Sequence, residues 1–196
     1  MTDEVVRISE RPRSIRAHAQ VLAATADILA REGFQAVTIE RIARESGVST
    51  ATIYKHWPSK TAVAAEAFGQ MARESIRSTT TDDPVQDLID IAVRTVTFYA
   101  RDGSGSAFRE LLAGCALESA GATYFRTYFL QPRREWLAPV WARAAEAGLV
   151  RADITPDHAM DVLFGPAVFA LLTRPDPVSD EQAAELVTSA LRGIAA

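Results

Sequence analysis

Apolar residues recur at every third or fourth position along most of this sequence, which is the period of an α-helix with one buried face. The first such segment starts at Ser14 and is expected to end at Gly33, with Phe34 folding back onto its last turn. From Pro84 onward the pattern stays helical and contains no convincing strand. The pattern therefore predicts an all-α protein.

The segment from Thr38 to Lys60 predicts two short helices joined by a tight turn. Thr38 is expected to cap the first helix, because a hydroxyl in that place accepts one of the free amide N–H groups of the first turn. Gly47 supplies the positive φ angle that a sharp turn needs, and Ser49 is expected to cap the second helix. Such a helical hairpin also occurs in proteins that bind no nucleic acid.

The two faces of the second helix differ in chemistry. Ile53 and Trp57 are four positions apart and are expected to face inward. The opposite face carries hydrogen-bond donors and small contact groups, namely Thr50, Thr52, Tyr54, Lys55 and His56. A short helix with an apolar anchor and a donor-rich outer face fits the major groove of DNA.

The same segment resembles the helix-turn-helix of the tetracycline-repressor (TetR-like) family of bacterial transcription regulators. The residues that carry the resemblance are Gly47-Val48-Ser49, Ile53-Tyr54-Lys55-His56-Trp57 and Lys60. The usual run of the family is Gly-Val-Ser, three variable positions, Leu or Ile, Tyr, a basic residue, His or Tyr, Phe, two residues and Lys. The sequence departs from it at Ala51, where glycine is common, and at Trp57, which replaces the usual phenylalanine. The resemblance is specific over residues 14–69 and only architectural beyond them.

Donor chemistry and the resemblance together predict which side chains contact DNA. The expected contacts are Thr38, Ser49, Thr50, Thr52, Tyr54, Lys55, His56 and Lys60. Lys55 is expected to bind a guanine edge, and Thr50 and Thr52 to contact thymine methyl groups. The other five are expected to contact phosphates and set the register. For Lys60 the motivation is its place in the first turn of a helix, where the helix dipole disfavours a cation.

Breaks in the helical pattern divide the chain into four parts. We expect a flexible N-terminal arm (1–13), a three-helix helix-turn-helix DNA-binding domain (14–58), a connecting helix (59–78) and a larger helical domain (79–196) for ligand binding and dimerisation. The arm is either a solvated tail or a basic segment that reaches phosphates or the minor groove. His18 in the first helix is interpreted as a surface histidine.

The larger domain is expected to contain five helical segments. They are predicted over residues 84–101, around Phe108–Cys115 after a loop at 101–106, over 122–147, from Pro156 and from Ser179, which has the spacing of a capping box. Kinks are expected at Pro132 and Pro139 and a bend at Gly165-Pro166. Acidic pairs such as Asp87 and Asp90 are interpreted as parts of solvated faces.

Aromatic residues are concentrated between positions 98 and 136, and two explanations remain open. They either fill an ordinary core or line an apolar cavity between helices. The resemblance implies the cavity, since TetR-like C-terminal domains usually bind a small inducer there. The candidate ligand-binding residues are Phe98, Phe108, Leu112, Cys115, Tyr128 and Phe164. Cys115 is either a redox sensor or a small buried hydrophobe.

Composition and charge exclude several classes of protein. The net charge of −4 argues against a protein that coats nucleic acid, but the charge is uneven: the first 60 residues hold nine Lys and Arg against seven acidic residues, and the rest twelve against eighteen. A single cysteine fits a reducing compartment. The sequence shows no signal-peptide pattern, and its longest apolar stretch is too short to cross a bilayer, so we expect a cytoplasmic protein with no membrane partner.

No catalytic motif, metal-ligand spacing or phosphate-binding glycine loop appears in the sequence, so neither an enzyme nor a cofactor is expected. The expected protein is a homodimeric transcription regulator that binds double-stranded operator DNA. We expect a repressor that a small apolar or amphipathic ligand releases from a near-palindromic operator. The alternatives are a dimeric DNA-binding protein whose second domain binds no small ligand or binds a protein, and, least favoured, an all-α enzyme. The dimer interface is expected on the last two helices, at Val162, Phe169, Leu172, Leu186, Val187 and Leu191.

Overall fold

The computed structural model describes residues 12–76, 80–100, 103–151, 153–174, 176 and 178–195. Within these ranges the chain is helical, and the β-type pairing found among them is an isolated antiparallel bridge between Val150 and Ala195. The all-α prediction is therefore confirmed. The elements are α1 (Pro12–Glu32), η1 (Phe34–Ala36), α2 (Ile39–Ser46), α3 (Thr50–His56), α4 (Lys60–Ser75), α5 (Pro84–Ala100), α6 (Ser104–Leu117), α7 (Gly121–Tyr124), η2 (Phe125–Leu130), α8 (Gln131–Glu146), α9 (Pro156–Thr173) and α10 (Asp180–Ile194).

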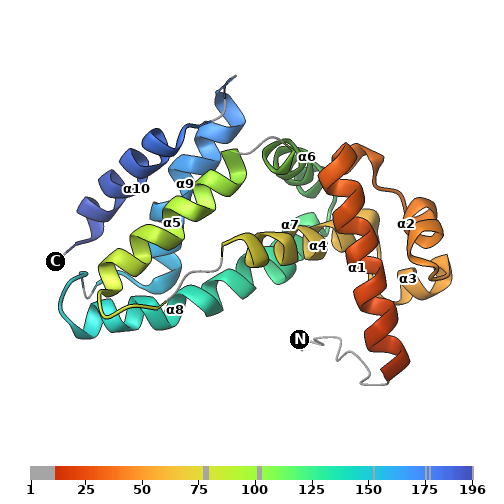
Figure 1. Cartoon of the computed structure of the whole chain (residues 1–196), viewed down its shortest axis with the longest axis horizontal. Coiled ribbons are helices and arrows are strands. Elements are labelled where there is room, and N and C mark those ends of the chain that lie inside the picture. Colours follow the sequence, from red (N-terminus) through yellow and green to blue (C-terminus); the bar gives the residue numbers. More distant parts are fainter. Residues whose placement is uncertain are drawn as a thin grey trace.

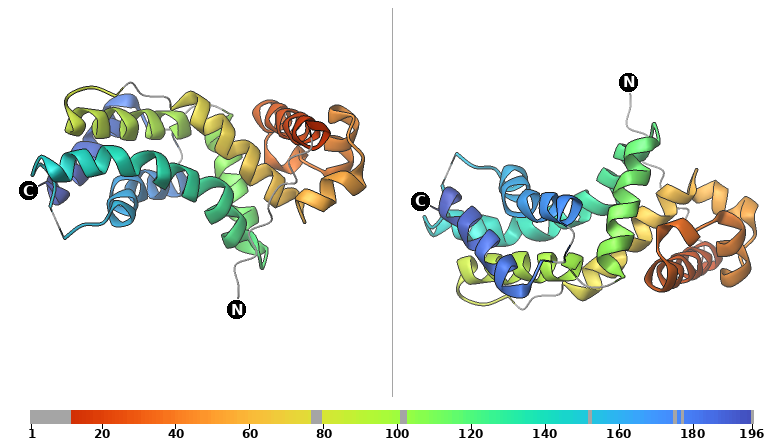
Figure 2. Two further views of the ribbon diagram at one scale, coloured as in Figure 1. Left: turned by 90° about the horizontal axis from the view of Figure 1, so that it is seen from below. Right: turned by 90° about the horizontal axis from the view of Figure 1, so that it is seen from above.

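The helices form two groups along the long axis of the molecule (Figure 1). Helices α1, α2 and α3 lie at one end, and α5, α8, α9 and α10 lie at the other. Helix α4 runs between the two groups, and both further views show it leading from α3 towards the larger group (Figure 2). Its position makes α4 the element that connects the two ends of the protein.

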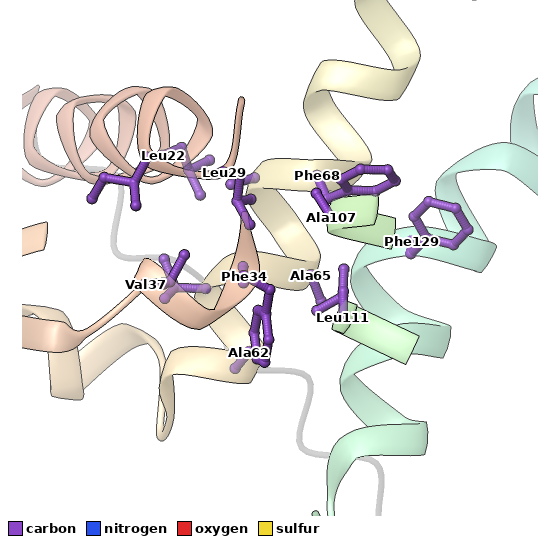
Figure 3. Packing of buried hydrophobic residues seen from close by; sticks show 14 of the residues in the cluster. Leu22, Leu29, Phe34, Val37, Ala62, Ala65, Phe68, Ala107, Leu111 and Phe129 are labelled. Carbon is purple, nitrogen blue, oxygen red and sulfur yellow. The ribbon is translucent and has the colours of Figure 1, made fainter. Parts of the chain in front are cut away.

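Helix α4 is buried on nearly all sides, because its sequence consists largely of small residues. Its buried positions are Thr61, Ala62, Val63, Ala64, Ala65, Ala67, Phe68, Gly69 and Ala72. A helix that is apolar around its circumference is stable only inside a core. The surrounding core residues come from α1, α6 and η2, among them Leu29, Leu111 and Phe129 (Figure 3). The core around α4 therefore joins α1 to α6 and η2, and a second core cluster lies between α5, α8, α9 and α10.

Aromatic rings fill the junction between α4 and the larger group. Phe68 of α4 is fully buried and stacks on Phe108 of α6, with ring centroids 5.3 Å apart. Tyr99 of α5 stacks on the same Phe108 at 4.3 Å and an interplanar angle of 4°. Phe129 of η2 completes the group at 5.1 Å from Phe108. Part of the aromatic concentration noted in the sequence therefore fills the core.

The segment before Pro132 is π-helical, and the proline explains why. Proline has no backbone N–H, and its ring clashes with the carbonyl four residues earlier, which here belongs to Tyr128. The wider turn of η2 accommodates this, with the amide of Gln131 donating to the carbonyl of Arg126, five residues back. The irregularity expected at Pro132 takes this form, whereas Pro139 lies inside α8 without ending it.

Gly69 lets α4 pack directly against this π-helical backbone. A Cβ atom at Gly69 would lie 2.4 Å from the carbonyl oxygen of Tyr128, far inside van der Waals contact. No other residue type therefore fits at this position without moving one of the two helices.

Several helix boundaries differ from those expected. Helix α1 begins at Pro12 rather than Ser14, and residues 1–11 of the expected arm lie outside the described part of the chain. Helix α6 begins at Ser104, inside the segment expected to be a loop. Helix α9 continues through Gly165 and Pro166 as one helix. In contrast, the capping box at Ser179 is confirmed, since its side chain accepts from the amide of Gln182 and the Gln182 side chain accepts from the amide of Ser179.

The interpretation of Asp87 as a solvated residue is wrong. Its side chain is 2 % exposed and accepts hydrogen bonds from the amide and hydroxyl of Thr81 and from Arg143, whose Nη1 lies 2.9 Å from Oδ2. Burial alone would raise the pKa of Asp87, but the bonds from Thr81 and Arg143 outweigh it and lower the pKa. The carboxylate therefore joins the loop before α5 to α8.

The expected dimer residues divide between the inside and the outside of the protomer. Val187 is fully buried and Leu191 is 8 % exposed, because this face of α10 packs into the core of its own chain. Their assignment to an interface is therefore wrong. Phe169 and Leu172 of α9 are 69 % and 50 % exposed and remain open to a partner.

The contact at Gly69 predicts a difference between two glycine-to-alanine variants. Gly69→Ala should lower the free energy of unfolding by about 1–3 kcal/mol, since the added methyl group collides with a backbone carbonyl. Gly193→Ala is the control: its Cβ would meet nothing within 4 Å, and helix propensity alone should stabilise it by up to about 1 kcal/mol. Urea unfolding measures both, and an equally stable Gly69→Ala protein would contradict the close approach.

Candidate nucleic-acid interface and internal cavity

The helical hairpin forms with the caps that the sequence predicts. The Thr38 hydroxyl accepts a hydrogen bond from the amide of Arg41 at 3.2 Å. Gly47 ends α2 with φ of 71°, and the Ser49 hydroxyl accepts from the amide of Thr52 at 3.3 Å. These bonds fix where α3 begins and how it leaves the turn.

The outward face of α3 gathers several of the predicted DNA-contact residues. Thr50, Tyr54 and Lys55 are exposed, with Tyr54 at 53 %. Thr52 is half-buried, and its hydroxyl lies 2.9 Å from that of Ser49. The exposed side chains of Thr50, Tyr54 and Lys55 leave hydrogen-bond donors open on this face of α3, as the predicted DNA contact requires.

A carboxylate on α4 holds the C-terminal end of α3 in place. Oε2 of Glu66 accepts a hydrogen bond from the indole N–H of Trp57 at 2.6 Å, and Oε1 lies 2.8 Å from Nε2 of His18 on α1. The His18 ring also packs on the Trp57 ring, with centroids 4.6 Å apart. The interpretation of His18 as a surface residue is therefore wrong. Glu66 instead joins α1, α3 and α4 through one side chain.

His56 is half-buried and lies beside this cluster. Its ring centroid is 6.2 Å from that of His18 and 5.7 Å from that of Trp57. Burial, followed by the nearby His18 and Lys55, lowers the pKa of His56 below its ordinary value of 6.5. Burial beside these cations therefore favours the neutral form of the ring in the protein without DNA.

Lys60 has an internal contact that the sequence did not reveal. It is half-buried at the start of α4, and its ammonium lies 4.7 Å from the centroid of the Phe34 ring. A cation–π contact of this kind offsets part of the unfavourable helix dipole. The position therefore has a structural explanation beside the expected phosphate contact.

Arginines on α2 differ in how far they are neutralised. Arg41 pairs with Glu32 and, at 2.8 Å, with Glu45, and the hydrogen bonds that it donates to these two carboxylates raise its pKa. The Arg44 side chain is 72 % exposed, and its nearest carboxylate oxygen, on Glu45, is 4.0 Å away. Arg44 is thus a candidate phosphate contact absent from the predicted set. Its place opposite the apolar stripe of α2 was the signal that could have identified it.

A cavity of about 410 Å³ lies between α5, α6, η2, α8 and α9. Three of the predicted ligand-binding residues line it: Phe108, Leu112 and Phe164. The other three, Phe98, Cys115 and Tyr128, are not part of its lining. Exposed residues of α9 lie at the rim, so the cavity reaches the surface. Its volume falls within the range typical of small-molecule sites.

The sequence missed several residues that line the cavity, including Tyr99, Phe129 and Arg133. Tyr99 and Phe129 belong to the concentration of aromatic residues between positions 98 and 136. Nothing in the sequence around Arg133 indicated that its side chain faces inward. For Cys115, burial followed by the neighbouring Glu118 raises the pKa to about 11. The thiol is therefore protonated and unreactive, which favours the small-hydrophobe explanation.

Metal-binding clusters and membrane-spanning helices are both absent from the described part of the chain. No group of three or more His, Cys, Asp or Glu side chains there is placed to hold a metal ion. None of the helices in these ranges is both long and apolar enough to cross a membrane.

A capped helix-turn-helix with an exposed donor face, joined to a larger helical domain, defines the class of helix-turn-helix transcription regulators. The profile described as "Bacterial regulatory proteins, tetR family" matches residues 21–67, and that of "Tetracyclin repressor-like, C-terminal domain" matches residues 79–190. This chain belongs to the TetR family of bacterial transcription regulators. It is therefore a DNA-binding regulator and not an enzyme.

Individual relatives agree with this assignment. The chain is 33 % identical to the HTH-type transcriptional regulator YdeS of Bacillus subtilis, over 95 % of this chain and 93 % of that protein. A crystal structure of the TetR family transcription regulator SCO0332 superposes with a TM-score of 0.81 at 32 % identity, covering 91 % of this chain and 98 % of that chain. TylP, a TetR regulator from Streptomyces fradiae, shares the fold with a TM-score of 0.63 at 19 % identity, covering 94 % and 89 % of the two chains.

Proposed function

We propose that the protein is a cytoplasmic repressor that a small apolar or amphipathic ligand releases from operator DNA. The observation that carries the proposal is the course of α4. Its first residue, Lys60, follows the recognition helix α3 directly, whereas Gly69 and Arg73 near its other end line a narrow pocket of about 30 Å³. Phe129, Arg133, Met160 and Phe164 line both this pocket and the larger cavity. A ligand among these side chains would contact the helix that positions α3.

The cavity also bears on the alternative functions. A second domain that binds no small ligand has no need of an apolar hollow of about 410 Å³ between its helices. A protein partner would cover its rim, where Phe169 and Leu172 are exposed, but would not fill its depth, where Phe108 and Phe129 are buried. The ligand-regulated repressor is therefore the function that the geometry supports best.

Dimerisation is the second part of the proposal. Two copies of a helix-turn-helix related by a two-fold axis bind a near-palindromic operator with half-sites about 34–36 Å apart, or further if the DNA is deformed. We place the interface on the exposed face of α9, which carries Phe169 and Leu172, together with the half-buried Leu186 of α10. Phe169 and Leu172 are large apolar side chains exposed on one helix, which favours a protein partner there.

The interface predicts different effects for leucine variants that differ in location. Leu172→Glu should convert the dimer into a folded monomer, because it places a charge in the proposed interface. Leu117→Glu is the matched control: Leu117 is 89 % exposed on α6, away from α9, and the variant should remain dimeric. Light scattering gives the mass of each. A Leu172→Glu protein that remained dimeric would mean that the interface lies elsewhere. Leu191→Glu, in contrast, should unfold the protomer, because Leu191 is buried in the core of its own chain.

Two lysines should differ in their effect on DNA binding. Lys60→Ala should weaken binding about equally on all sequences and reduce the salt slope by about one unit per half-site, as for the loss of one phosphate contact. Lys55→Ala should instead relax the preference at one base pair of each half-site by about 1–3 kcal/mol. Genomic fragments retained by the wild-type protein supply the operator, and salt-dependent titrations compare it with mutated sites. A change of sequence preference in Lys60→Ala would exclude the phosphate role.

Ligand release predicts reciprocal coupling. A ligand that releases the operator should bind the protein–operator complex about 5–150-fold more weakly than the free protein, because linkage requires the same factor in both directions. Calorimetric titration of free protein and of the complex measures the two affinities. Equal affinities would end the proposal for that ligand. Phe68→Ala, in the buried face of α4, should reduce the coupling while changing each separate affinity less.

A further inference from the structure

Arg133 occupies an unusual position between the two cavities. Its side chain lines both the larger cavity of about 410 Å³ and the narrow pocket of about 30 Å³ beside α4. The guanidinium carbon lies 3.9 Å from the centroid of the Phe129 ring, so the cation is stacked on an aromatic wall. Its Nη1 donates to the hydroxyl of Tyr99. Its Nη2 is shielded from solvent and has no hydrogen-bond partner among the described residues.

The charge of Arg133 is not balanced by a carboxylate. The ion pairs formed within the described ranges do not include Arg133. Burial lowers its pKa to about 9, so the side chain is still protonated at neutral pH. An ionised group that is removed from water without a counter-ion is costly, and proteins ordinarily pair such groups.

Neighbouring charges do not supply the missing counter-ion. Asp161 at the rim of the larger cavity pairs with Arg134, at 3.6 Å, and Arg134 also faces Asp157 at 3.4 Å. The narrow pocket adds Arg73 from α4 and has no acidic residue among its described lining. The wall shared by the two cavities is therefore electropositive.

Asp87, in the same domain, is a buried charge that does have a partner of opposite charge. Asp87 is 2 % exposed, and its carboxylate is paired with Arg143 and bonded to Thr81. Arg133 departs from this arrangement where it lines the larger cavity and the narrow pocket. The rest of the lining is apolar or aromatic, with Leu112, Phe125 and Val168 along its length.

Building on the proposed ligand role of the cavity, we propose that the ligand is an amphipathic carboxylate. Its head group pairs with the guanidinium of Arg133, and its apolar body lies against the aromatic wall. A guanidinium fork matches a carboxylate in two parallel hydrogen bonds. The negative head also attracts Arg73 on α4, which links recognition of the charge to the helix that positions α3.

A pair of isosteric probes tests the charge. Naphthalene-2-carboxylate and naphthalene-2-carboxamide have the same shape and differ in charge. The affinity of each is to be measured by displacement of the neutral fluorophore N-phenyl-1-naphthylamine from the full-length protein. The carboxylate should bind at least about tenfold more tightly than the amide, as for a charge-assisted hydrogen bond in a shielded site. Arg133→Met should abolish this preference while leaving the binding of the neutral fluorophore close to wild type.

Two further variants separate recognition from general effects. Arg133→Lys keeps the charge without the fork and should retain part of the preference. Arg126→Met removes an exposed arginine of η2 and should leave the preference unchanged. A wild-type protein without preference, or an Arg133→Met protein that keeps it, would overturn the proposal. So would an Arg133→Met protein that loses the neutral fluorophore as well, since Arg133 would then only support the fold.

The proposed ligand role itself fails in a different way. Leu112→Trp fills the larger cavity and should abolish binding of the neutral fluorophore. If the wild-type protein does not bind that fluorophore, or if Leu112→Trp binds it unchanged, the cavity is not the ligand site and the repressor mechanism loses its basis. If the fluorophore binds in the cavity but the carboxylate has no advantage, only the chemical class of the ligand is wrong.

Discussion

The burial of α4 on nearly all sides is the constraint on which the rest of the structure depends. Small side chains let α1 pack on one side of this helix and α6 and η2 on others, so that α4 joins these elements in one core. The closest approach is at Gly69, where the backbone of η2 lies against α4. Residues 61–69 of this helix are stable only inside this packing, because they are largely apolar, whereas the polar residues Gln70, Arg73 and Glu74 are exposed in its last turns.

Burial makes α4 suitable for transmitting a displacement. Close-packed interiors move between discrete arrangements rather than deform continuously, so a small shift at one end of a packed helix is felt at the other. In the N-terminal half of α4, Glu66 holds the C-terminal end of α3 through Trp57. Near the other end Arg73 lines the narrow pocket that Arg133 also lines. These two arginines lie on α4 and α8, which both pack against η2.

Local signals in the sequence determined much of the fold. The caps at Thr38, Ser49 and Ser179 and the turn at Gly47 all form as predicted, because each depends on a backbone conformation and on partners two to four residues away. The helical period and the motif around α3 likewise predicted the all-α fold and the family. The exposed donor face of α3 follows from its own spacing, since Ile53 fixes which side is buried.

Tertiary contacts decided whether a residue is buried or exposed wherever its partners lie far away in the sequence. Asp87 is buried because Arg143, far along the chain, neutralises it, and His18 is held because Glu66 and Trp57 converge on it. Leu191 has the same apolar character as Leu172, yet only the packing of α10 places it inside. Arg133 looks like any surface arginine in sequence. Its burial without a counter-ion arises from the arrangement of five elements around a cavity, and no local pattern encodes that arrangement.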